Sequence, residues 1–232
     1  MKTIIANSQE LYTEAAQRIA RVLEEKPDAV LAFSAGRTME LLFRALAGLC
    51  GEGKVSLSAA KVFAVTEYEG IPPDRSCRAA IEKGLLGTTD LKEENCTFLD
   101  QSNWEVYDRL IQEAGGLDLA VLGLGINAHI GYNEPATPFD SYTHRQKLTD
   151  ATKRQNAAVF GSTEAVPDYA YTMGIKTLVS ARQILVLVSG EEKAEAVFKM
   201  LYARDDSAVP AAFLQIPLNV EIYVDREAAA KL

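Results

Sequence analysis

Apolar residues recur along the chain with two alternating periods. Residues 8–25 repeat apolar side chains at helical spacing, and Asn7 and Glu10 stand at the spacing of a capping box at their start. This pattern predicts an amphipathic helix. The short apolar run 29–34 then predicts a buried strand, which passes through a tight turn into the helical pattern of residues 39–49. The chain therefore opens with a helix followed by a strand–turn–helix unit.

The strand and helix patterns repeat to the end of the chain. Strands are predicted at 61–66, 117–125, 183–190 and 220–225, and helices at 102–116 and 191–203. The strands are apolar on both faces and alternate with helices, which is typical of a parallel sheet covered on both sides. We therefore predict an α/β fold with a three-layer, doubly wound, mainly parallel sheet of Rossmann-like type.

No internal division is visible in the sequence. Neither a Ser/Gly-rich linker nor a repeat of fixed period interrupts residues 1–232, so we expect a single domain. Residues 126–171 are the least regular part and contain three prolines. Because a segment of that length without clear periodicity is usually functional, we expect the active site, and a lid over it, in this segment.

Composition narrows the class of protein. A chain of 232 residues, 48% of them hydrophobic and 24% charged, can bury a core without disulfides, and its composition argues against disorder and collagen-like structure. The net charge of -8, without basic blocks, argues against a nucleic-acid partner. An anionic small molecule stays compatible, because local amides and one or two cations can outweigh a distant net charge.

The cysteines and the hydropathy pattern point to one compartment. Cys50, Cys77 and Cys96 form neither a CxxC motif nor a cluster with histidine, which fits a reduced cytoplasm and gives no metal site. No stretch approaches the ~20 apolar residues of a membrane span. We therefore expect a cytoplasmic protein without a membrane partner.

Four predicted strand ends carry polar or glycine-rich turns. They are residues 34–38, 66–68, 123–135 and 189–193. In an open α/β sheet, ligands bind beyond the carboxyl ends of the strands, where helix N-termini present free N–H groups. All four turns should therefore face one crevice.

The first of these turns has the composition of an anion cradle. It contains Ser34, Ala35, Gly36, Arg37 and Thr38, so that a hydroxyl, a glycine and a cation precede a helix. Phosphate suits such a site. An ordinary strand–helix turn with a solvated arginine explains the segment equally well, and the absence of GxxxxGK[ST] argues against ATP.

The loop after strand 117–125 carries proton-transfer chemistry. Residues 123–128 match GxGxxA, but no helix pattern starts there, so we set nicotinamide binding aside. Asn127, His129 and Glu134 follow within eight residues, and a histidine oriented by a carboxylate is a common general acid and base. The alternative is a structural histidine that donates to a loop carbonyl, beside a solvated glutamate.

Two further charged residues lie at strand ends. Glu67 is either a base or a solvated carboxylate. Lys193 stands in the first turn of a predicted helix, where a cation opposes the helix dipole, and this suggests an anionic partner. The alternative is a surface lysine beside two glutamates.

The order of these segments resembles the glucosamine-6-phosphate deaminase and isomerase family, and its galactosamine-6-phosphate branch in particular. The resemblance is carried by residues 26–46, 62–72, 115–135 and 166–197, with GxxxxxHIxxNEP at Gly123–Pro135 as the most specific part. It covers nearly the whole chain.

The resemblance implies a conversion without metal or cofactor. A galactosamine 6-phosphate or glucosamine 6-phosphate would become a ketohexose 6-phosphate and ammonia. His129 would open the sugar ring and Glu134 would orient it, while residues 34–38 and Lys193 would hold the phosphate. The resemblance also leaves a homo-oligomer open.

Three residues depart from the family pattern. Thr66 stands where the family has the aspartate that moves the C2 proton, and Asn127 replaces a ring-opening aspartate, although asparagine is familiar in the galactosamine branch. Ala158 stands where the glucosamine branch has a phosphate-binding arginine, for which Arg37 would compensate. Glu67 is the nearest replacement base, provided that its strand ends before it, since adjacent strand residues point to opposite faces.

Two other functions stay open because of Thr66. A phosphogluconolactonase-like hydrolase would use His129 to activate water and would need no base at C2. A sugar-phosphate sensor would keep the phosphate site and have lost the base.

Overall fold

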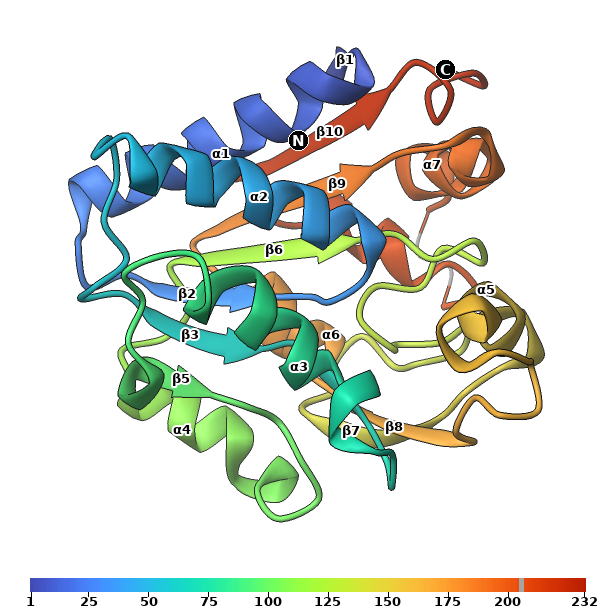
Figure 1. Ribbon diagram of the computed structural model, residues 1–232. Coiled ribbons are helices and arrows are strands. Elements are labelled where there is room, and N and C mark those ends of the chain that lie inside the picture. Colours follow the sequence, from blue (N-terminus) through green and yellow to red (C-terminus); the bar gives the residue numbers. More distant parts are fainter. Residues whose placement is uncertain (205–206) are drawn as a thin grey trace.

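The computed structural model describes residues 1–204 and 207–232, in which a seven-stranded sheet lies between two layers of helices (Figure 1). The strands of this sheet are all parallel and follow the order β1-β10-β9-β6-β2-β3-β5. The predicted α/β fold with a mainly parallel, doubly wound sheet is therefore confirmed.

The bounds of the elements are as follows. The strands are β1 (Lys2–Ala6), β2 (Val30–Phe33), β3 (Lys61–Ala64), β4 (Thr66–Tyr68), β5 (Cys96–Thr97), β6 (Leu119–Gly123), β7 (His144–Lys147), β8 (Tyr169–Thr172), β9 (Gln183–Val188) and β10 (Val220–Asp225). The helices are α1 (Ser8–Glu25), α2 (Arg37–Gly51), α3 (Cys77–Ile81), α4 (Tyr107–Glu113), α5 (Asp150–Phe160), α6 (Ile175–Val179) and α7 (Ala194–Tyr202).

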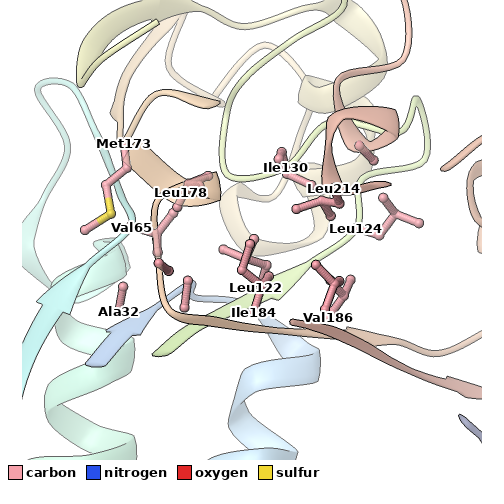
Figure 2. Close-up of a cluster of buried hydrophobic side chains, with 14 of the residues drawn as sticks. Ala32, Val65, Leu122, Leu124, Ile130, Met173, Leu178, Ile184, Val186 and Leu214 are labelled. Carbon is pink, nitrogen blue, oxygen red and sulfur yellow. The ribbon is translucent and has the colours of Figure 1, made fainter. Parts of the chain in front are cut away.

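The central strands are apolar on both faces because each face of the sheet has its own core. In β6, Leu119 and Val121 belong to the cluster under α1, α2 and α3, whereas Ala120 and Leu122 belong to the cluster under α4, α6 and α7. Figure 2 shows Leu122 with other members of the second cluster. This alternation explains why no polar face appears in the sequence of the strand.

The sheet reverses its direction of growth between β2 and β6. The chain passes from β2 to β3 and β5 on one side, then returns to β6 and continues to β9 and β10 on the other. In doubly wound folds the loops that leave such neighbouring strands diverge and form a crevice for ligands. The loops that begin at Ser34 and Leu124 leave this point.

A second sheet begins just beyond the end of β3. It is antiparallel and has the order β4-β8-β7, and α5 lies between β7 and β8 in the chain. Residues 126–143 and 161–168 are irregular, as expected, but β7, α5 and the start of β8 were not predicted. Strand β7 alternates between half-buried and exposed residues and contains no apolar run, so its sequence carries no strong strand pattern.

Two further differences concern strands. The predicted strand 61–66 ends at Ala64, because the chain leaves the large sheet there and Thr66 begins β4 of the small one. Strand β1 was not predicted, because it lies at the sheet edge and only Ala6 of its residues is buried.

The helix at 8–25 is confirmed, and Asn7 Oδ1 accepts the Glu10 N–H (2.9 Å). Within the described ranges, no helix has the length and hydrophobicity needed to cross a membrane.

The packing makes a testable prediction about stability. Leu122 is fully buried, so Leu122→Ala should lower the free energy of unfolding by about 2–5 kcal/mol through the cavity that it leaves. Leu218 is 90% exposed, and Leu218→Ala should stay within about 0.5 kcal/mol of the parent. Urea denaturation of the three proteins measures both effects. Equal changes in the two variants would contradict this description of the core.

Candidate active site

His129 lies in the loop after β6 and is the first member of a buried hydrogen-bonded chain. Its Nδ1 is 2.7 Å from Asn127 Oδ1, and Asn127 Nδ2 donates to Glu134 Oε2 at 2.8 Å. Because the asparagine uses its N–H toward the carboxylate, its oxygen must accept, and Nδ1 of His129 carries the hydrogen. Nε2 is then the basic nitrogen of the ring.

The surroundings keep this imidazole neutral. Burial lowers the pKa of His129 below its usual value, and the Lys193 ammonium lowers it further, while the Glu134 carboxylate opposes both. Glu134 Oε2 lies 3.8 Å from His129 Nδ1. The ring can therefore accept a proton at Nε2 at neutral pH, and Glu134 stabilises the imidazolium that results.

The start of α5 holds this chain in place. Thr149 donates to Glu134 through its N–H (3.1 Å) and its hydroxyl (3.2 Å), and Thr152 Oγ1 lies 3.1 Å from His129 Nδ1. Thr149 is also the N-cap of α5 and accepts the Thr152 N–H. Our sequence analysis missed both threonines, for which the capping position of Thr149 was the available signal.

The backbone around His129 is tightly folded. Gly125 donates its N–H to the His129 carbonyl (2.9 Å), and Ala128 adopts a φ of 62°, which is unusual for a residue with a side chain. A Cβ on Gly125 would lie 2.3 Å from Nδ1 and Cε1 of His129. The glycine-rich run therefore makes room for an imidazole ring, and no helix starts there.

Apolar residues anchor the loop to the core. Leu124 and Ile130 flank the His129 segment and are buried in the cluster that contains Leu122 and Leu214 (Figure 2). The loop is therefore fixed from both sides.

The loop at residues 34–38 leaves the neighbouring strand β2. The Ser34 hydroxyl is buried and has no hydrogen-bond partner in the described part of the protein. A buried polar group of this kind is costly unless a ligand or water satisfies it. Gly36 adopts a φ of 112° as the N-cap of α2, and Arg37 and Thr38 are the first residues of that helix, with Arg37 exposed. These groups can bind an anion.

Lys193, the N-cap of α7, contacts the loop after β6. Its Nζ donates to the Leu124 carbonyl (2.7 Å) and to Gln155 Oε1 (3.2 Å), and burial lowers the pKa of Lys193 to about 8. Gln155 Oε1 also accepts the Ile126 N–H (2.8 Å). The lysine therefore lies against the His129 loop and is not a solvated surface residue.

An apolar cluster joins the two loops. Ala35 packs against a cluster that includes Tyr132 from the His129 loop and Phe160 from α5. Lys193 bonds to Leu124 of the same loop, so the loop after β6 is linked to both segments. Within the residues that the structure describes, no three His, Cys, Asp or Glu side chains are grouped as metal ligands would be.

Glu67 and Thr66 have different surroundings. The Glu67 carboxylate accepts the N–H groups of Tyr68 (2.8 Å), Cys77 (3.0 Å) and Arg78 (2.9 Å). Burial raises the pKa of Glu67, and these bonds oppose the rise. Strand β4 includes Glu67, so the condition under which it would replace the family's base is not met. Thr66 is buried, with Oγ1 3.5 Å from Cys77 Sγ.

The position of Gly125 can be tested by NMR. Gly125→Ala should push the imidazole out of its place, and the pKa of His129 should rise toward about 6.5 because burial no longer lowers it. Gly123→Ala is the matched control, since a Cβ there meets nothing within 4 Å. The chain has two histidines, so introducing His144→Asn into both proteins leaves the ring signals of His129 alone in the spectrum. An unchanged His129 titration in Gly125→Ala would contradict the geometry.

The chain is similar to known proteins over nearly its whole length. Residues 5–221 match the family model described as glucosamine-6-phosphate isomerases/6-phosphogluconolactonase. The chain is 36% identical over 232 residues to a glucosamine-6-phosphate deaminase of Bacillus pumilus, covering 97% of this chain and 96% of the relative. It is 35% identical over 241 residues to one of Clostridium acetobutylicum, covering 100% of both.

Solved structures extend the comparison. A monomeric glucosamine-6-phosphate deaminase superimposes with a TM-score of 0.97 at 34% identity, covering 100% of both chains. A 6-phosphogluconolactonase of Trypanosoma brucei has a TM-score of 0.77 at 19% identity, covering 100% of this chain and 98% of that one. The second likeness shows the fold alone.

Proposed function

Because this chain belongs to the family of glucosamine-6-phosphate isomerases and 6-phosphogluconolactonases, we propose that it is a deaminase and isomerase of hexosamine 6-phosphates. The observation that carries the proposal is the hydrogen-bonded chain His129–Asn127–Glu134 beside Lys193. It lies in the loop that follows β6, next to β2, where the order of strand addition changes sides. The relatives described above are named for glucosamine 6-phosphate. A preference for galactosamine 6-phosphate stays a prediction, so both epimers enter the test.

The first chemical step is opening of the sugar ring. His129 Nε2 accepts the proton of the O1 hydroxyl, the bond from C1 to O5 breaks, and the imidazolium returns the proton to O5. Asn127 keeps the ring in the required tautomer, and Glu134 stabilises the transient cation. This proton transfer by His129 needs no metal ion.

The phosphate anchors the substrate at the other end. Lys193 supplies charge, the Ser34 hydroxyl supplies an unused donor, and residues 36–38 supply the N-terminus of α2, with Arg37 and Ala35 at its edge. Binding energy from this remote group can align the reacting carbons over His129. The substrate partner is therefore a sugar 6-phosphate.

The second step moves a proton from C2 to C1, and Thr66 makes this step slow. A hydroxyl is a far poorer base than the aspartate that the resemblance implies at this position. Loss of a general base typically costs about 10²–10⁴-fold in rate. We therefore propose a slow deaminase whose ring-opening residues are complete.

Thr66 is also compatible with two other candidate functions. A hydrolase would open 6-phosphogluconolactone with water that His129 activates, and this reaction needs no base at C2. A sensor that only binds the sugar phosphate would likewise tolerate Thr66. Both candidates use the same phosphate site.

Ammonia release tests the proposal. With glucosamine 6-phosphate and galactosamine 6-phosphate, ammonia and ketose 6-phosphate should appear in equal amounts from at least one sugar. Thr66→Asp should raise the rate by about 10²-fold or more, because it supplies the missing base. Calorimetry with the same sugars detects a sensor, and hydrolysis of 6-phosphogluconolactone detects the hydrolase. Either of these without ammonia release would replace the proposed function.

Lys193 makes the binding pH-dependent. Its folded pKa of about 8 lies below its ordinary value, so the ammonium is lost as the pH rises through about 8. The sugar phosphate is a dianion throughout this range, since its second pKa is about 6. The Kd for glucitol 6-phosphate, an unreactive open-chain analogue, should therefore rise between pH 7.5 and 9.5. In Lys193→Arg the Kd should stay flat over this range, and calorimetry measures both. The same rise in both proteins would exclude Lys193 as the source.

A further inference from the structure

The two steps of the proposed reaction make different demands on the protein. Ring opening moves a proton between oxygen atoms, which a neutral imidazole can do. Transfer between C2 and C1 removes a proton from carbon, which requires a well-placed base. The groups that ring opening requires are present. His129 is neutral, its tautomer is fixed by Asn127, and Glu134 lies close enough to stabilise the imidazolium.

At the start of β4, the described side chains that cluster around Cys77 are all neutral, so none of them can serve as the base of the second step. Thr66 Oγ1 lies against Cys77 Sγ (3.5 Å), and the rings of Tyr68 and Tyr132 pack with centroids 5.2 Å apart in the same cluster as Cys77. Burial raises the pKa of the Cys77 thiol and of both phenols. All three therefore keep their protons at neutral pH.

The carboxylate of Glu67 in β4 is already hydrogen-bonded to the backbone. Glu67 follows Thr66 in β4 and points to the opposite face of the strand. Its oxygens accept three backbone N–H groups, two of them from the first residues of α3. Moving the carboxylate to a substrate would leave these buried donors unpaired.

We propose that this protein is an anomerase of aldohexose 6-phosphates, which interconverts their α and β pyranose forms through the open chain faster than it releases ammonia from an amino sugar. The inference rests on the ring-opening and phosphate-binding parts of the proposed function. It does not need the deamination step.

The reaction is balanced and needs no co-reactant. The O1–H proton passes to His129 Nε2, the C1–O5 bond breaks, and O5 takes the proton, which gives the free aldehyde. Half a turn about the C1–C2 bond exposes the other face of the carbonyl to O5 while the phosphate stays bound. O5 then attacks C1, its proton returns through Nε2, and O1 is protonated in the opposite configuration.

The substrate class follows from which atoms take part. Neither the His129 chain nor the phosphate site requires a nitrogen at C2, because only O1, C1 and O5 react. Aldohexose 6-phosphates with an amine or a hydroxyl at C2 should therefore both be substrates. This range is wider than that of a deaminase, which must have the amine as its leaving group.

Exchange NMR measures the activity directly. The α and β anomeric protons of glucosamine 6-phosphate and of glucose 6-phosphate give separate signals, and exchange cross-peaks report their interconversion at equilibrium. With the protein, the exchange rate per site should exceed the buffer rate for both sugars. For glucosamine 6-phosphate it should also exceed the rate of ammonia release, because loss of a general base slows the C2 step by about 10²–10⁴-fold and leaves ring opening untouched.

Matched variants assign the activity to the site. His129→Asn should reduce exchange to the buffer rate, whereas His144→Asn should leave it unchanged, since His144 bonds to Tyr142 and Gln146 in and beside β7. If His129→Asn does not fold, Gly125→Ala with Gly123→Ala as control displaces the ring without removing it. Thr66→Asp should raise ammonia release, because it supplies a base for the C2 step.

Each result has a defined meaning. Exchange without ammonia release supports the anomerase and removes the proposed deaminase. Ammonia release with exchange no faster than in buffer, or no faster than the release itself, overturns the anomerase and leaves the deaminase standing. Exchange that persists in both His129→Asn and Gly125→Ala also overturns it, because the imidazole is then not the group that opens the ring. If the protein shows neither exchange nor ammonia release with either sugar, both the anomerase and the deaminase are excluded.

Discussion

The structure of the site depends on one buried carboxylate that neutral donors of the described residues satisfy. Glu134 is 1% exposed and is satisfied by the Asn127 amide and by the N–H and hydroxyl of Thr149. A buried charge is tolerated only where such bonds replace water. They join the loop after β6 to the first turn of α5, and they fix which nitrogen of His129 carries its hydrogen. Tertiary packing and proton chemistry are therefore set by the same contacts.

The site combines a cation with a neutral acid–base group in a protein of net charge -8. Lys193 is held by two neutral oxygens, those of Leu124 and Gln155, so its charge stays available to an anion. The same charge helps to keep His129 unprotonated. Phosphate binding would offset it, because a dianion close to the ammonium favours an imidazolium. In the proposed function, a bound phosphate would therefore favour the imidazolium that forms during ring opening.

Much of the fold and part of the site were predictable from sequence. Strands β2, β6 and β9 are apolar on both faces, a pattern that a sheet with a core on each side explains. Histidine, asparagine and glutamate within eight residues were visible as a group. Thr149 and Thr152 were not part of that group. The capping position of Thr149 could have predicted a helix start, but nothing local shows that the cap also binds a distant carboxylate.

The sequence by itself determined the class of sheet, the loops at its carboxyl edge and the residue types available for chemistry, because periodicity and composition are local properties of the chain. Only the tertiary structure decided that Glu67 is bound by the start of α3, that Lys193 lies against the His129 loop, and that a small antiparallel sheet forms beside the crevice. Those outcomes depend on contacts between residues far apart in the chain. Burial and hydrogen-bond satisfaction select among such contacts, and neither can be evaluated before the elements are packed.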